Sequence, residues 1–345
     1  MTLPAPSTAA TRVAAFDCGT NSLRLLVADI SPDGTLAEVV RATRIVRLGQ
    51  GVDATGEFAP EALERTFAVC EEYAAIVAEH APAHLRFIAT SATRDVRNRE
   101  EFVDGVRERL GVEVDVITGD EEAALSFLGA THGGVAAARV DAPAPYLVMD
   151  LGGGSTELVL GTDAVEAALS MDIGSVRLTE RFLDPEHTGA PPHAEAIAAA
   201  RASVDEWYAK ATAVVPVGKA RTLVGVAGTI TTLTAGVLGL TEYDRTAIHG
   251  AHLPVDRILE SVEALLGMTR EERAALPYLH PGRVDVIAAG ALIFGRLVER
   301  LRADVEADSG SLTVIASETD ILDGTALSLA RSAQTSTHTT RPTEG

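Results

Sequence analysis

The chain has 345 residues, of which 49 are acidic and 29 are lysine or arginine, so its net charge is −20. A protein that binds nucleic acid or anionic membranes in general needs a basic face. The charge therefore excludes this class of function. Its two cysteines cannot build a disulfide framework, and it shows neither a secretory signal nor an apolar run of the roughly 20 residues that a membrane helix needs. We therefore expect a cytoplasmic protein without a membrane or nucleic-acid partner.

The first half of the chain has the pattern of an α/β unit that opens with a hairpin. Residues 13–27, VAAFDCGTNSLRLLV, place an apolar run on each side of a polar turn. The other expected elements are an extended stretch at 36–49, a helix at 59–81, a strand at 85–90, a helix opened by TSATRD, a strand at 112–118 and a helix at 119–133.

The second half contains another hairpin, at residues 146–160, YLVMDLGGGSTELVL. The other expected elements are a loop at 133–145, an extended stretch at 165–172, a helix at 192–213, a strand at 221–228, a helix after it, a long helical region at 255–302, a strand at 312–317 and a helix at 323–331. We predict two domains, over residues 12–128 and 129–331. The polar ends at 1–11 and 332–345 are expected to be disordered.

The two hairpins match each other in register. The match places Asp17 on Asp150, Gly19 on Gly152, Ser22 on Ser155 and Arg24 on Glu157. Glycines let the backbone approach a ligand closely, and exposed N–H groups with hydroxyls make an anion-binding concavity. The aspartate beside each turn would repel a bare phosphate, so we expect it to hold a divalent cation. The match predicts a duplicated domain whose two phosphate loops face each other across a cleft. The alternative is two unrelated tight turns.

A third glycine loop follows the strand at 221–228, where Gly228 and Thr229 begin a helix. A junction of strand, glycine and helix presents free N–H groups and a helix dipole to an anion. Alone this is a weak signal, because many α/β turns look alike. After two hairpin loops in this order, it predicts a further contact with phosphate.

Carboxylates also open the helix at 119–133, where Asp120, Glu121 and Glu122 follow a strand. One reading is simple compensation of the helix dipole. The other is that one glutamate points into the cleft as a general base. Adjacent helix residues face different directions, so only one of Glu121 and Glu122 can serve.

Arg94 lies in TSATRDVRN, a turn between a strand and a helix that is rich in serine and threonine. Its guanidinium could hold a phosphate through two hydrogen bonds. A structural ion pair is an equally good interpretation, and the residues do not decide between them.

Together these motifs resemble those of the exopolyphosphatase / guanosine pentaphosphate phosphohydrolase family, within the actin-like ATPase superfamily. The strings that carry the resemblance are FDCGTNSLRLLV, RLGQGV, TSATRDVRN, ITGDEEA, VMDLGGGSTELV, GSVRLTERF and GVAGTITTL. The resemblance extends from about Arg12 to Leu329. Within the family, the chain is most similar to the short form, which has two domains. The resemblance implies an α/β fold of two ribonuclease-H-like domains with a central interdomain cleft.

The resemblance also implies a reaction, namely hydrolysis of the terminal phosphoanhydride of inorganic polyphosphate with Mg²⁺ or Mn²⁺. Glu122 would be the general base that positions the attacking water. Asp150 and Glu157 would be metal-associated groups, together with Asp17. The expected substrate-binding residues are Thr20, Asn21, Ser22, Arg94, Gly152, Gly153, Gly154, Ser155, Gly228 and Thr229.

Other functions stay open at this point. The same site could act as a pppGpp 5′-phosphohydrolase, since both substrates end in the same anhydride. A small-molecule kinase or a non-catalytic nucleotide-binding scaffold would share the loops but not the string Gly-Asp-Glu-Glu-Ala or the full set of carboxylates. The apolar carboxy-terminal half could also support a homodimer.

Overall fold

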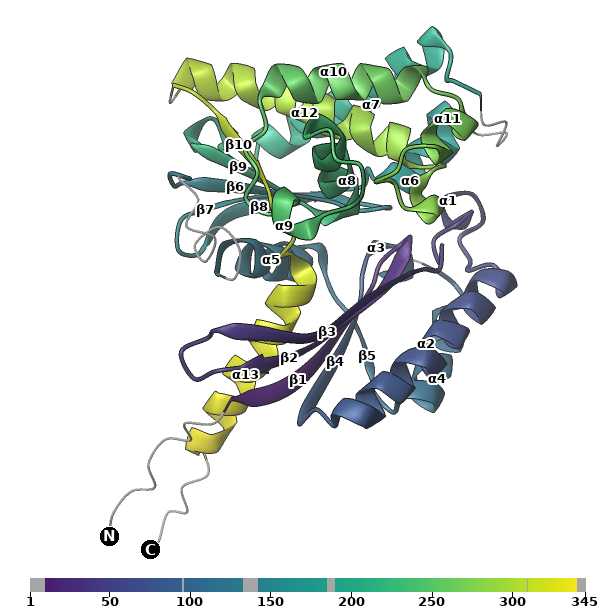
Figure 1. Cartoon of the computed structure of the whole chain (residues 1–345), viewed down its shortest axis with the longest axis vertical. Coiled ribbons are helices and arrows are strands. Elements are labelled where there is room, and N and C mark those ends of the chain that lie inside the picture. Colours follow the sequence, from purple (N-terminus) through teal and green to yellow (C-terminus); the bar gives the residue numbers. More distant parts are fainter. Residues whose placement is uncertain (1–9, 95, 133–141, 185–189, 309, 340–345) are drawn as a thin grey trace, which may run out of the picture.

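The protein is built from two α/β domains stacked along the long axis of the molecule (Figure 1). The computed structural model describes residues 10–94, 96–132, 142–184, 190–308 and 310–339. Most of the loop expected at 133–145 therefore lies outside the described residues, as do the outermost residues of both ends. No helix in the described ranges is long and apolar enough to cross a membrane.

Each domain contains a five-stranded mixed sheet, and the two sheets have the same topology. The first has the order β3-β2-β1-β4-β5 and the second the order β8-β7-β6-β9-β10. In both, the first two pairings are antiparallel and the last two are parallel. The strands are β1 Thr11–Cys18, β2 Ser22–Ile30, β3 Leu36–Ile45, β4 His84–Ala89, β5 Val114–Val116, β6 Tyr146–Leu151, β7 Thr156–Gly161, β8 Val165–Met171, β9 Thr222–Val226 and β10 Thr313–Ala316. The duplication that the matched hairpins predict is present.

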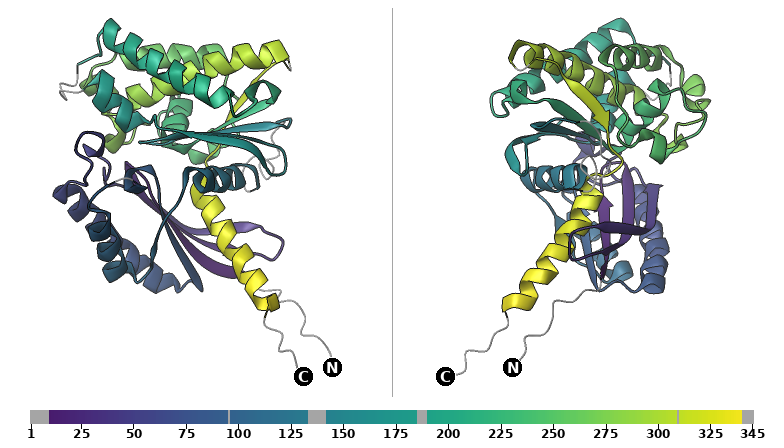
Figure 2. Two further views of the ribbon diagram at one scale, coloured as in Figure 1. Left: turned by 180° about the vertical axis from the view of Figure 1, so that it is seen from behind. Right: turned by 60° about the vertical axis from the view of Figure 1, so that its left-hand side comes forward.

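Helices cover the outer face of each sheet (Figure 2). The α-helices in the described ranges are α1 Val52–Thr55, α2 Pro60–His80, α3 Ser91–Arg94, α4 Arg99–Leu110, α5 Gly119–Ala130, α6 Ser175–Leu178, α7 Ala194–Thr212, α8 Ala227–Val237, α9 Arg245–Ile248, α10 Val255–Gly267, α11 Arg270–Ala274, α12 Ile287–Asp308 and α13 Ile321–Thr339. On the first sheet, α2 and α4 bury Tyr73 and Phe102 against Phe16 and Phe87. On the second sheet, α7, α8, α10 and α12 build the larger core.

The helix α5 lies between the two sheets, and α13 starts beside it and runs along the first sheet (Figure 1). Although α5 follows the first sheet in the chain, its Ala123 and Phe127 pack on the second sheet. Conversely, Leu322 and Ala326 of α13 pack on the first sheet. The packing therefore does not follow a single cut of the chain near residue 128.

The last helix is longer than its sequence predicts. In the structure α13 includes residues 332–339, which lie in the polar stretch after the last predicted helix. Their polar composition contains no signal for a helix, but α13 is already anchored through Leu322, Ala326 and Ala330. Extending an existing helix costs far less than nucleating one, because each added residue gains a backbone hydrogen bond.

Candidate active site

The tips of the two hairpins meet across the central cleft. A Cβ atom added at Gly154, in the turn between β6 and β7, would lie 2.6 Å from Thr20 Oγ1 and 2.7 Å from Ser91 Oγ. One added at Gly153 would lie 2.9 Å from Thr20 Cβ. Only glycine permits such an approach of backbone to side chain. The two loops therefore face each other, as the matched hairpins predict.

Both loops line one cavity of about 90 Å³, the central cavity. The expected site residues that line it are Asp17, Thr20, Asn21, Ser22, Asp150, Gly152, Gly153, Ser155, Gly228 and Thr229. Four other expected residues, Arg94, Glu122, Gly154 and Glu157, are not part of its lining. The first and second hairpins and the junction of β9 with α8 thus converge on one small space.

The two hairpins differ in charge at one matched position. In the first, Arg24 lies opposite Asp17 in the β1–β2 ladder and donates to its Oδ2 at 2.5 Å and 2.8 Å. In the second, Glu157 lies opposite Asp150 in the β6–β7 ladder. Directly opposed side chains lie on the same face of a sheet, and like charges there repel. The second hairpin therefore has two facing carboxyl groups and, unlike the first, no arginine opposite its aspartate.

The face of the second sheet that bears Asp150 is covered by α5. Ser126 of this helix donates to Asp150 Oδ2 at 2.6 Å, and Ser170 of β8 donates to Glu157 Oε1 at 2.7 Å. Burial raises the pKa of Asp150 to about 7, and the charge of Asp320 acts in the same direction. Burial also raises the pKa of Glu157 well above its ordinary value, with the charges of Glu122 and Asp150 adding to the shift.

Glu122 is the glutamate of α5 that points inward. It is 7% exposed, and Arg94 donates from Nη1 to its Oε2 at 2.7 Å. Burial raises the pKa of Glu122 to about 7, with Arg94 opposing the shift and Asp17 adding to it. A carboxylate that titrates near neutral pH is suited to proton transfer. Glu121 instead forms an ion pair with Arg86 at the surface.

The donor set around the central cavity fits a magnesium-type cation. Asp17 Oδ1 is buried without a hydrogen-bond partner in the part of the chain that the structure describes, and burial raises the pKa of Asp17. No cluster of three or more His, Cys, Asp or Glu side chains among the described residues is arranged to hold a metal by itself. Mg²⁺ does not need one, because it binds through one or two carboxylates plus waters and substrate phosphates.

Two residues of the site have no signal in the sequence motifs. Arg283 lines the central cavity, and its guanidinium lies against Gly228, whose added Cβ would be 2.2 Å from Nη2. No carboxylate of the described residues forms an ion pair with Arg283, which donates to Thr232 Oγ1 at 3.3 Å. The other is Asp320, which accepts from Arg24 Nη1 at 2.5 Å. Both come from the second half of the chain, and Asp320 is 296 residues away from Arg24 in the sequence.

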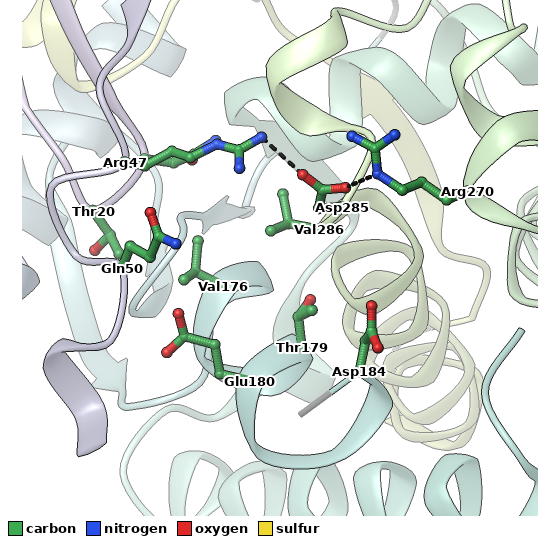
Figure 3. Close-up of a pocket in the computed structure, with 11 residues that line it drawn as sticks. Thr20, Arg47, Gln50, Val176, Thr179, Glu180, Asp184, Arg270, Asp285 and Val286 are labelled. Carbon is green, nitrogen blue, oxygen red and sulfur yellow. Dashed lines mark hydrogen bonds and ion pairs between the residues drawn. The ribbon is translucent and has the colours of Figure 1, made fainter. Parts of the chain in front are cut away.

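Two larger cavities flank the central one. The first, the Asp285 cavity, has about 350 Å³ and shares Thr20, Asn21 and Val286 with it. Figure 3 shows Arg47 and Arg270 both directed at Asp285 in this cavity. The second, the arginine cavity, has about 470 Å³ and shares Arg24, Gly228 and Arg283 with the central cavity.

Comparison with known proteins places this geometry in a family. The family model described as "Ppx/GppA phosphatase family" matches residues 26–325. The chain belongs to the Ppx/GppA phosphatase family. Exopolyphosphatase 2 of Mycobacterium tuberculosis is 50% identical over 330 residues, which cover 93% of this chain and 99% of that protein.

Solved structures of the family have the same fold. A crystal structure of an exopolyphosphatase-like protein is 47% identical with a TM-score of 0.88, covering 94% of this chain and 99% of the other. The Aquifex aeolicus family member is 30% identical with a TM-score of 0.72, again covering 94% and 99%. The expected family and the expected α/β fold of two domains are both confirmed.

Proposed function

We propose that this protein is an exopolyphosphatase, which hydrolyses the terminal phosphoanhydride of inorganic polyphosphate. The observation that carries the proposal is the meeting of two phosphate loops beside Glu122, an inward-facing carboxylate with a pKa of about 7. Relatives over nearly the whole chain bear the name exopolyphosphatase, which supports this choice among phosphatase substrates.

In the proposed mechanism the terminal phosphoryl group lies between the two hairpin tips. Backbone N–H groups at 153 and 154 and the hydroxyls of Thr20, Ser22 and Ser155 donate to its oxygens, while Arg283 compensates its charge. Glu122 accepts a proton from water as the water oxygen attacks phosphorus. The bond from phosphorus to the bridging oxygen breaks, which releases orthophosphate and leaves a chain one unit shorter.

Arg94 has two proposed tasks in this mechanism. Its Nη1 holds Glu122, and its Nη2 is proposed to donate to a phosphate oxygen. Gly228 and Thr229 are proposed to contribute at the start of α8, where backbone N–H groups are left without partners inside the helix. With these assignments, the two hairpin loops and the junction of β9 with α8 all bind the same substrate.

The carboxylates Asp17, Asp150 and Glu157 are proposed to hold Mg²⁺ or Mn²⁺. Such an ion, when bound, would spread the charge that builds up on the phosphate oxygens. The unneutralised pair formed by Asp150 and Glu157 and the unpartnered Oδ1 of Asp17 support this assignment.

A pppGpp 5′-phosphohydrolase is the second candidate, because Tyr243 and Tyr278 line the arginine cavity and could contact a base. One assay separates the two functions: release of phosphate from polyphosphates of defined length and from pppGpp, at equal concentration, with and without Mg²⁺. We expect faster release from polyphosphate and none after removal of the metal. No phosphate release from polyphosphate under any of these conditions would overturn the proposal.

A further inference from the structure

The central cavity is too small for more than the end of a polyphosphate chain. Its volume of about 90 Å³ compares with about 350 Å³ and 470 Å³ in its two neighbours. The phosphates behind the reacting one must therefore extend into the Asp285 cavity or into the arginine cavity. The two differ in charge, and this difference gives the chain a direction.

The Asp285 cavity has no spare positive charge. Its two arginines, Arg47 and Arg270, both donate to Asp285, at 2.8 Å and 2.7 Å. Glu180 and Asp184 also line it, so carboxylates outnumber arginines there (Figure 3). A polyanion entering this cavity would meet net repulsion in a protein that is already strongly negative.

The lining of the arginine cavity has the opposite balance, with four arginines, Arg24, Arg41, Arg245 and Arg283, and two carboxylates, Glu318 and Asp320. The first three arginines already form ion pairs, in part with carboxylates behind the lining, namely Asp17, Glu38 and Asp323. Arg283, the member shared with the central cavity, has no carboxylate partner among the described residues. A cation without a carboxylate partner is stabilised when an anionic group of the substrate binds beside it.

Arg245 stands further out in the same cavity. It donates to Glu38 and Glu318 at 3.2 Å and 3.1 Å, and its side chain is 42% exposed. Because it is this exposed, exchanging these carboxylates for phosphate oxygens costs little. Arg283 and Arg245 thus provide an inner and an outer positive charge along one cavity.

We propose that the arginine cavity is the subsite for the internal phosphates of the substrate chain, with Arg245 as a binding residue for them. The inference rests on the proposed function. It assigns a direction to the substrate, away from the Asp285 cavity, and a role to a residue outside the loops that contain the sequence motifs.

The test compares two arginines of similar exposure, one in each cavity. Arg245→Gln and Arg270→Gln are assayed on tripolyphosphate and on a long polyphosphate of defined length. For Arg245→Gln, the loss in kcat/KM should be about fivefold greater on the long chain than on tripolyphosphate, mainly through KM. Arg270, 48% exposed, should show no such difference. Arg245→Lys should recover part of the loss, because it keeps the charge.

A second measurement is independent of turnover. In the Glu122→Gln background, binding of the long chain should weaken about fivefold when Arg245 is also replaced by glutamine. An equal loss of kcat/KM on both chain lengths would show that Arg245 acts only by holding the two domains together, and would overturn the inference. A length-dependent loss in Arg270→Gln alone would place the chain in the Asp285 cavity and overturn it as well. Absence of phosphate release by the unmodified protein would instead refute the proposed function.

Discussion

Arg94 and Glu122 form an ion pair that joins the end of α3 to the first turn of α5. The distance from Arg94 Nη1 to Glu122 Oε2 is 2.7 Å. Burial raises the pKa of Glu122 to about 7, and Arg94 is the first influence that opposes the shift. The fraction of ionised Glu122 near neutral pH therefore depends on Arg94.

Replacing Arg94 with glutamine should move the pH dependence of hydrolysis. In the unmodified protein, kcat/KM should rise with pH through about 7, because Glu122 accepts a proton only when it is ionised. Loss of the opposing positive charge should move this rise upward by about one pH unit or more. The measurement is kcat/KM on both sides of pH 7. An unmoved profile in a less active variant would mean that another group titrates.

Glu122→Gln and Glu121→Gln should behave very differently, although the residues are adjacent. Glu122 is buried and pairs with Arg94, whereas Glu121 pairs with Arg86 at the surface. Loss of the general base should lower kcat about a hundredfold or more, with little change in polyphosphate binding. Glu121→Gln should stay within about twofold of the unmodified protein. A Glu122→Gln protein with an ordinary rate would remove Glu122 from the mechanism.

Glu157→Gln should stabilise the metal-free protein at alkaline pH. The pKa of Glu157 is raised in the folded state, so its contribution to stability is complete below the ordinary pKa and is lost as pH rises. Glutamine cannot ionise and avoids this loss, so the variant should have a higher free energy of unfolding than the unmodified protein at pH 8.

The measurement is the free energy of unfolding at pH 5 and pH 8. Asp205→Asn is a control of opposite sign, because hydrogen bonds from Arg300 and Arg296 lower the pKa of Asp205. That variant should be destabilised at pH 8. If Glu157→Gln is also destabilised at pH 8, ionisation of Glu157 does not destabilise the folded protein as we propose.

Much of the fold can be predicted from the sequence because its signals are local. The apolar runs of both hairpins and the regular spacing of buried residues in α2 follow directly from strand and helix periodicity. The sequence does not predict that α5, which follows the first sheet in the chain, packs on the second sheet, or that α13 packs on the first. This packing depends on contacts such as Leu322 with the first sheet, and no local pattern records which sheet a helix covers.

The same distinction holds for the site. Residues next to the glycine turns, such as Asp17 and Asp150, are marked by their motif and its repetition. Arg283 lies in LHPGRVD, outside the three glycine loops of the predicted site, and reaches the central cavity only through the tertiary fold. The sequence alone does not decide whether Arg94 binds phosphate or forms an ion pair, because its partner Glu122 lies 28 residues away.

Gly154→Ala should impair catalysis by separating the two loops. Its Cβ would meet Thr20 Oγ1 at 2.6 Å and Ser91 Oγ at 2.7 Å, so one loop must move. Because catalysis depends on groups on both sides, kcat/KM should fall about tenfold or more. Gly267→Ala, at the end of α10, meets no atom within 4 Å and should leave kcat/KM unchanged. Equal activity of the two variants would argue against a tight meeting of the loops during the reaction.

The central claim is that two matched loops enclose the terminal phosphoryl group of the chain. The most direct test is a crystal structure of the Glu122→Gln variant with tripolyphosphate and Mg²⁺. We expect the terminal phosphoryl group between Thr20–Ser22 and Gly152–Ser155, with the next phosphate beside Arg283. A chain bound on the outer surface or in the Asp285 cavity, with the two loops in contact with solvent alone, would contradict it.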